Sequence, residues 1–100
     1  MTTAERKYVP PANHRILFEN DRVRVMEVAI RPGETSGMHE HPATLVYQLT
    51  DCRVRFAFPD GSSQVVDSKA GNSVWTDGVQ HEVHNIGTTD DIGIIVELKQ

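Results

Sequence analysis

Short apolar runs alternate with polar residues along most of the chain after residue 13, and turn-forming residues separate these runs. A period of two is the pattern of a β-strand that buries one face. The clearest case is RVRFAF (53–58), which is followed by an Asp60-Gly61 pair suited to a tight hairpin turn and then by SQVV (63–66). The other runs expected to form strands are RILFE (15–19), RVRVMEVAI (22–30), TLVYQL (44–49), NSVW (72–75), HEVHNI (81–86) and IGIIVEL (92–98).

No segment keeps apolar residues at helical spacing for ten residues without a glycine or proline, so little or no helix is expected. About eight short strands in a chain of 100 residues predict an all-β fold, a small antiparallel β-barrel or jelly roll. The Pro10-Pro11 pair blocks regular structure near the start. We therefore expect an irregular N-terminal arm over residues 1–13 and a single domain over residues 14–100.

Composition narrows the class of protein. With 38% hydrophobic and 24% charged residues, the chain has the balance of a globular domain, and its net charge of −4 argues against a nucleic-acid surface. No apolar run is long enough to span a bilayer, and the polar start lacks a signal-peptide core, so a cytoplasmic location is predicted. Cys52 is the single cysteine, which excludes an intrachain disulfide, and a reactive thiol is not expected at this position after Asp51.

The first candidate for chemistry is the sequence His39-Glu40-His41, which lies in a stretch that reads as extended. Strand alternation points both imidazoles to one face, where they could ligate a single ion. A third ligand must come from elsewhere, and His81, directly after the DGVQ turn, is the natural supplier, whereas His84 should point away from it. The alternative is that the histidine pair is simply a solvated strand end.

Glycines and histidines together fit two separate motifs. In the first, five residues separate Gly33 from the His39-x-His41 pair. The second contains Gly71, Gly78, His81 and Asn85. In these motifs the chain resembles the cupin family, and the resemblance covers most of the chain after about residue 20. It implies a small jelly-roll barrel that holds a metal ion inside.

The chain also departs from the family pattern. The motif's glutamate falls at Thr44, Leu45 or Val46, none of which can replace a carboxylate ligand, and its closing glycine falls at Asp51 or Cys52. In the second motif Thr76 stands in place of the usual proline, one residue short of the usual spacing. The resemblance therefore implies three histidine ligands without an acid, His39, His41 and His81, holding one divalent ion of Fe, Zn, Ni or Mn.

Such a site predicts a function but leaves two classes open. Three neutral imidazoles leave the ion its full positive charge, which favours a small anionic or dicarbonyl ligand. The first class is a metal-dependent enzyme, dioxygenase-like, with isomerase or decarboxylase chemistry behind it. The second is a non-catalytic metal- or ligand-binding cupin that acts as a sensor or accessory protein.

Three further side chains are candidates for binding the ligand. If Thr44 occupies the empty acid position, alternation sends Gln48 into the barrel, where it either hydrogen-bonds water on the metal or pairs with a neighbouring strand. Phe56 is expected in the apolar lining. Trp75 lies next to the TDGVQ turn and is expected either to form a pocket wall or to be plain core.

The remaining polar residues have no assigned chemistry. Glu27 and Glu97 lie in apolar strands and are expected at an edge or interface, and His14 is given no role. The arm over residues 1–13 and the RILFE run carry apolar residues that gain by pairing with another sheet edge. A homodimer is therefore expected.

Overall fold

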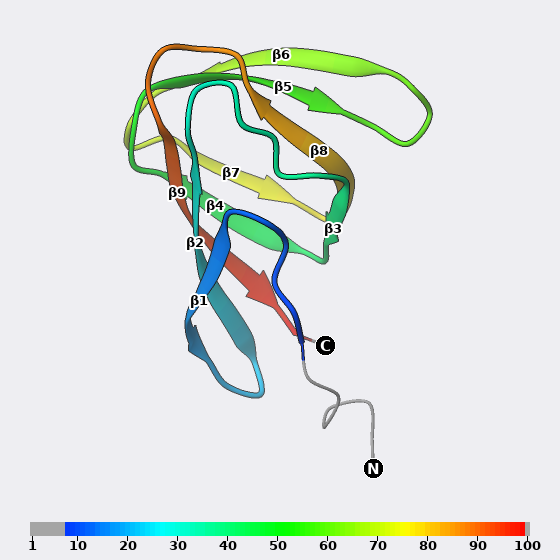
Figure 1. Ribbon diagram of the computed structural model, residues 1–100. Helices are drawn as coiled ribbons and strands as arrows, with labels where there is room; N and C mark the ends of the chain where they lie inside the picture. Colours follow the sequence, from blue (N-terminus) through cyan, green and yellow to red (C-terminus); the bar gives the residue numbers. More distant parts are fainter. Residues whose placement is uncertain (1–7, 100) are drawn as a thin grey trace.

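The computed structural model describes residues 8–99, and over this range the chain forms nine β-strands and no helix (Figure 1). The prediction of an all-β fold is confirmed. Within residues 8–99, no helix is long and apolar enough to cross a membrane. The strands are β1 His14–Glu19, β2 Val23–Ile30, β3 His39–His41, β4 Thr44–Gln48, β5 Cys52–Ala57, β6 Ser63–Ser68, β7 Ser73–Thr76, β8 Val79–Asn85 and β9 Asp91–Leu98.

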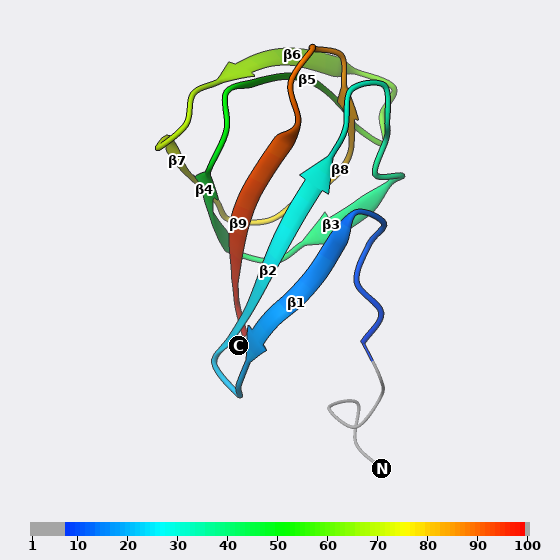
Figure 2. The same cartoon turned by 60° about the vertical axis from the view of Figure 1, so that its left-hand side comes forward.

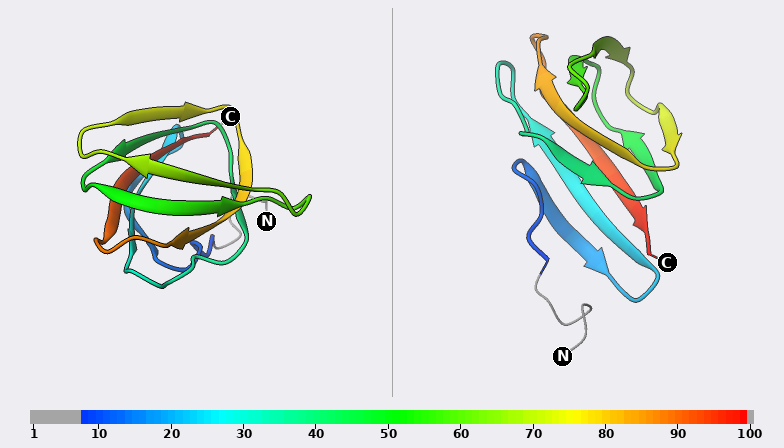
Figure 3. Two further views of the ribbon diagram at one scale, coloured as in Figure 1. Left: turned by 90° about the horizontal axis from the view of Figure 1, so that it is seen from above. Right: turned by 90° about the vertical axis from the view of Figure 1, so that its right-hand side faces the viewer.

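The strands form two antiparallel sheets that face each other. One has five strands in the order β1-β2-β9-β4-β7, and the other has four in the order β3-β8-β5-β6. Seen from above, the two sheets curve around a common interior (Figure 3), and the predicted small barrel of the jelly-roll type is confirmed. At one side of this barrel the edge strands β1 and β3 lie next to each other (Figure 2), and these two strands carry histidines.

Each of the eight predicted runs overlaps one strand, and the ninth strand is the three-residue His39–His41 segment. The expected hairpin joins β5 to β6, with Val54 opposite Val66. Its turn places Gly61 at a φ of 88°, a left-handed conformation that suits a residue without a Cβ. The Gly61 amide donates to the Phe58 carbonyl at 3.0 Å. Local turn chemistry therefore sets this register.

The hydrophobic core lies between the sheets. It draws on β2, β5, β8 and β9, whose inward-facing apolar side chains pack against one another because alternation aims them at the interior. Its buried members are Met26, Val28, Ile30, Cys52, Val54, Val83 and Ile95.

The motif residue Asn85 holds two loops onto this core. Its side chain is fully buried and donates to the carbonyls of Ile30 and Thr89, each at 2.8 Å. Its own carbonyl accepts from the amide of Gly33, the first glycine of the other motif, at 2.8 Å. Both motifs therefore contain residues that shape the barrel.

The first strand begins at His14. Residues 8–13, the part of the expected arm that the structure describes, form neither helix nor strand. Residues 1–7 lie outside the described part of the chain.

Candidate metal centre

Four histidines gather at one end of the barrel interior. His39 and His81 face each other as a cross-strand pair of β3 and β8, and His41 lies two residues along β3, on the same face. His14 comes from the other sheet, at the first residue of β1. The rings of His39 and His41 have centroids 4.8 Å apart, and the centroid of His14 lies 5.1 Å from His39 and 5.5 Å from His41.

His14, His39 and His41 are positioned to hold a metal ion, since one ring nitrogen from each lies within 4.8 Å of the others. The sequence analysis missed His14 because it lies 25 residues before His39, next to an irregular segment, and no spacing rule joins the two. His81 belongs to the same cluster, with ring centroids 4.9 Å from His39 and 5.6 Å from His41. The set of His39, His41 and His81 as metal ligands stays a prediction, and the structure adds His14 as a further candidate.

Hydrogen bonds orient three of the rings in the same way. The Nδ1 atom of His14 donates to the Ala12 carbonyl at 2.9 Å, and that of His39 donates to the Gly37 carbonyl at 2.8 Å. In His41 the same atom contacts a carboxylate oxygen of Glu97 at 2.6 Å. With Nδ1 engaged as a donor, each ring keeps its Nε2 lone pair for a metal ion.

The Nε2 atom of His39 is the most direct sign of a missing ligand. It is buried, and it has no hydrogen-bond partner among residues 8–99. A buried polar atom without a partner costs free energy unless something binds to it. An all-nitrogen donor set of this kind fits a divalent transition metal.

Burial favours the neutral form of three of these imidazoles, those of His14, His39 and His81. It lowers the pKa of His14 to about 4 and that of His81 to about 4, and it also lowers the pKa of His39. The neighbouring histidines add to the shift at all three positions, since a second positive charge nearby is unfavourable. Neutral imidazole is the form that binds metal, so near neutral pH the cluster is ready for an ion.

We expect the metal-free protein to lose stability as the pH falls from about 6.5 towards 4. An unfolded histidine has a pKa of about 6.5, whereas His14 and His81 titrate near 4 in the folded chain. Between these values the unfolded chain binds more protons than the folded chain, so the free energy of unfolding falls as the pH is lowered. Above pH 6.5 these histidines are neutral in both states, and the full stability is present. Urea unfolding over this range, with a chelator present, measures the slope.

The control for this pH dependence is a double variant, His14→Gln with His81→Gln. It removes both titrating groups and should show a flatter dependence between pH 4 and 6.5. An unchanged slope would mean that other groups govern the stability.

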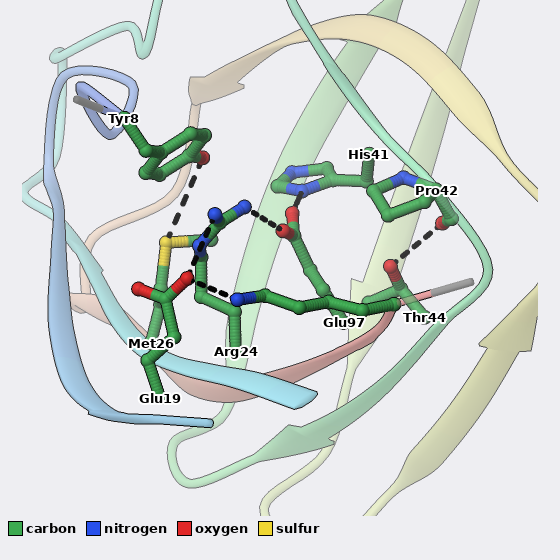
Figure 4. A network of polar contacts seen from close by, with 9 residues as sticks. Tyr8, Glu19, Arg24, Met26, His41, Pro42, Thr44 and Glu97 are labelled. Carbon is green, nitrogen blue, oxygen red and sulfur yellow. Dashed lines mark hydrogen bonds and ion pairs between the residues drawn. The ribbon is translucent and has the colours of Figure 1, made fainter. Parts of the chain in front are cut away.

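A buried acid supports the site from behind (Figure 4). The Glu97 side chain is only 2% exposed; one of its oxygens accepts from His41, and the other accepts from Nη1 of Arg24 at 3.3 Å. Thr44, one of the three residues at which the motif's glutamate can fall, is the direct cross-strand partner of Glu97. The motif's carboxylate is absent from β4, but the neighbouring strand β9 carries one at Glu97. This carboxylate contacts the ring of His41 and does not itself take the place of a metal ligand.

The guanidinium of Arg24 is held from several sides. Its Nη2 donates to Glu19 at 2.9 Å, and Lys99 also contacts that Glu19 oxygen. The Tyr8 ring stacks on the guanidinium, whose central carbon lies 3.5 Å from the ring centroid. Together with the His41–Glu97 contact, these contacts form a continuous series of hydrogen bonds and ion pairs from His41 to the surface (Figure 4). The expectation that Glu97 is an edge or interface residue is therefore wrong.

The histidines line one end of an interior cavity of about 340 Å³. Thr44, Val46 and Gln48 point into it from alternate positions of β4. Most of its wall is apolar, and it includes Phe56, whose ring stacks on that of His81 with centroids 5.2 Å apart. This volume is at the low end of the range for small-molecule sites, roughly 300–1,000 Å³.

The structure places the remaining candidate residues differently. Gln48 is buried in the cavity wall, but its amide nitrogen donates to Asp91 at 2.8 Å and to the Ile92 carbonyl at 3.2 Å, so it pairs with the neighbouring strand. Trp75 is 51% exposed and does not line the cavity. Its neighbours Val74 and Thr76 do, because alternation along β7 turns the indole outward. Trp75 is therefore neither pocket wall nor core.

Cys52 and His84 lie apart from the metal centre. Cys52 is buried, and burial together with the nearby Asp91 raises the pKa of its thiol to about 12, which leaves it unreactive. His84 follows Val83 on β8 and does not line the cavity.

Comparison with known proteins connects this geometry to a family. The sequence matches no protein-family model and no curated protein. Its fold matches a cupin domain from Bordetella pertussis Tohama I with a TM-score of 0.81 and 28% identity, covering 94% of this chain and 99% of that one. The chain has the fold of this cupin domain and resembles it in sequence. The resemblance inferred from the two motifs is confirmed.

Two other solved structures resemble this chain in fold. A predicted oxalate decarboxylase from Thermotoga maritima is 24% identical, with a TM-score of 0.64 over 87% of this chain and 79% of that one. The polyketide cyclase RemF from Streptomyces resistomycificus is 19% identical, with a TM-score of 0.65 over 92% of this chain and 71% of that one. At these identities the likeness concerns the fold alone.

Proposed function

We propose that this cupin binds one divalent transition metal through His14, His39, His41 and His81 and uses it to hold a small anionic or dicarbonyl molecule. His14 takes the place of the motif's absent glutamate as the fourth ligand. The observation that carries the proposal is that three rings have Nδ1 engaged and Nε2 free at one end of a cavity. When bound, the ion supplies a Lewis acid for oxygen ligands and, if it is iron, the redox chemistry of a dioxygenase.

The residues of the cavity favour an anion only at the metal. Among the described side chains that line the cavity, none is a lysine or arginine. An anionic group therefore has one attractive position, next to the ion, and the apolar wall receives the rest of the molecule. Phe56, stacked on His81, is placed to contact a flat body next to the metal.

A non-catalytic role is the second candidate, as a metal or ligand sensor or an accessory protein. It is favoured by the state of the two buried acids near the cavity. Glu97 is held by His41 and Arg24, and Asp91 lies at the opposite end of β9 from Glu97. Neither is placed to move a proton to or from a substrate at the metal, so the chain offers no general acid or base there among residues 8–99.

Metal analysis of protein purified without a histidine tag tests the proposal first, with one ion per chain as the expected result. Dioxygen uptake by iron-loaded protein against β-dicarbonyls, thiols and catechols then separates the two candidates. Uptake with one class supports the enzyme, and metal-dependent binding without uptake supports the sensor. Absence of stoichiometric metal under all loading conditions would leave the barrel as a scaffold and refute both.

We also propose a homodimer, formed by pairing of the β1 edges of two copies. Among residues 8–99, β1 pairs with β2 alone and has no strand on its other edge, and its residues Ile16, Leu17 and Phe18 are all exposed. Light scattering at micromolar concentration should give the mass of a dimer. Phe18→Lys should shift it to a monomer, because a lysine on an edge strand opposes pairing.

Val65→Lys is the matched control for the dimer. Val65 lies on β6, an edge strand of the other sheet, and is similarly exposed. This variant should remain dimeric. A monomeric wild-type protein refutes the dimer. If Val65→Lys breaks the dimer and Phe18→Lys does not, the interface lies at β6 and the proposed β1 pairing is wrong.

A further inference from the structure

One row of residues crosses the floor of the cavity from the histidines to a second polar group. In the sheet register His14 pairs with Val28, Val28 with Gly93, and Gly93 with Gln48. Three strand spacings of about 4.8 Å separate the ends of this row, roughly 14 Å between backbones. Because side chains reach inward from both ends, the gap suits a body of one ring with a short side chain.

Gly93 lies between Val28 and Gln48 in this row. A Cβ atom at this position would lie 3.6 Å from Oε1 of Gln48 and 3.6 Å from Cγ1 of Val28, and 3.3 Å from the Tyr47 carbonyl oxygen. The side chains of Val28 and Gln48 therefore close over Gly93, and these two residues form the cavity wall at this point of the row.

The second polar group centres on Asp91, which is 7% exposed and lines the cavity. Its carboxylate accepts from Gln48 Nε2 at 2.8 Å, and the thiol of Cys52 is its other close neighbour. Both neighbours are neutral. Within residues 8–99, no lysine, arginine or histidine forms an ion pair with Asp91, whereas Glu97 at the other end of β9 has Arg24.

A buried carboxylate with only neutral donors is incompletely compensated for the water it has lost. The group that would compensate it best is a cation, and the cavity wall supplies none. A cationic group that pairs with Asp91 must therefore be part of the ligand.

We propose that Asp91, supported by Gln48, is a second binding pole that takes a protonated amine, so that the cavity's ligand is a small zwitterion. This inference rests on the proposed metal function. The anionic oxygens of the ligand bind the ion at the histidines, its ammonium group pairs with Asp91, and its apolar body lies between Val28 and Phe56.

The rival explanation is that Asp91 and Gln48 merely tie the start of β9 to the end of β4. A structural tie predicts no preference among ligands. A binding pole predicts that an ammonium group adds affinity and that a carboxylate at the same position removes it.

The test uses zinc-loaded full-length protein and three probes with one metal-binding head: catechol, 4-(2-aminoethyl)catechol and 3-(3,4-dihydroxyphenyl)propionate. Zinc avoids oxidation of the probes, and metal content is checked after each titration. By calorimetry we expect the amine to bind at least about 10-fold more tightly than catechol, and the propionate more weakly than catechol. In Asp91→Asn, which keeps an acceptor for Gln48, the ratio of amine to catechol affinity should fall to about 1.

Asp67→Asn is the matched control, because it removes the same charge from an exposed residue outside the cavity. It should leave the ratio unchanged, which excludes a general effect of net charge. The comparison of probes on unmodified protein needs no variant, so a poorly folding Asp91→Asn leaves it intact. Equal affinity for the amine and the propionate, or a ratio that survives Asp91→Asn, overturns the second pole.

The two proposals fail separately. If catechol binding requires zinc and is lost in His39→Ala, the metal function stands whatever the amine does. If no probe binds in a zinc-dependent way, the metal function fails, and the second pole fails with it.

Discussion

His39→Ala is expected to abolish stoichiometric metal binding. His39 offers a buried Nε2 with no other partner among the described residues, and its Nδ1 is fixed by the Gly37 carbonyl, so its ring is already oriented as a ligand. Loss of a residue behind a ligand weakens metal binding about 10- to 100-fold, and loss of the ligand itself should exceed that. Metal content and a competition titration with a chelator measure the effect.

The other histidines then show how many ligands the site has. His14→Ala and His81→Ala should each weaken binding if all four rings coordinate the ion. His84→Ala is the control, since it lies on the same strand as His81 but outside the cavity. Full metal occupancy in His39→Ala contradicts the site, and wild-type affinity in His14→Ala reduces it to the three ligands of the motifs.

The second large effect is expected from Glu97→Gln. The neutral amide cannot balance Arg24 and orients His41 less firmly, so metal binding should weaken about 10- to 100-fold. Breaking a buried ion pair also lowers the free energy of unfolding by about 3 kcal/mol or more, although Arg24 keeps Glu19 as a partner. Titration with metal and urea unfolding measure the two losses separately.

Positioning of His41 by Glu97 must be distinguished from a general loss of stability. Glu97→Asp keeps the charge and should restore part of the metal affinity. Glu27→Gln breaks the exposed pair with Arg15 on the same sheet and should leave metal affinity unchanged. If Glu97→Gln is destabilised yet binds metal with wild-type affinity at a temperature where it is folded, Glu97 is structural only.

The strands could be predicted because their signals are local. Alternation and turn residues lie within a few positions of each other, and the eight runs found this way each overlap a strand. The motif histidines of β3 and β8 could be placed for a similar reason, since fixed spacing relates them to nearby glycines. His14 has no such local signal, because only the packing of β1 against β3 brings it to the site.

Glu97 was misjudged for a different reason. Along β9, four apolar residues alternate with Asp91, Gly93, Ile95 and Glu97, and hydrophobicity suggests that the apolar face is the buried one. The structure buries the opposite, more polar face more completely. The interior of this barrel holds a cavity and a histidine cluster, and these require polar support that a plain core would not. The outward turn of Trp75 reflects the same inversion, on β7.

The position of the histidines on two edge strands has a mechanical consequence. His14 belongs to the last strand of one sheet and His39 and His41 to the last strand of the other, and no backbone ladder joins β1 to β3. An ion bound by these residues would link the edges of the two sheets. Its free energy of binding would then add to the stability of the contact between β1 and β3. At a free metal concentration 100 times the dissociation constant, that contribution is about 2.7 kcal/mol. The free metal concentration would then set how firmly the β1–β2 hairpin is held against β3. A single small domain could in this way report metal occupancy through the stability of the contact between its two sheets.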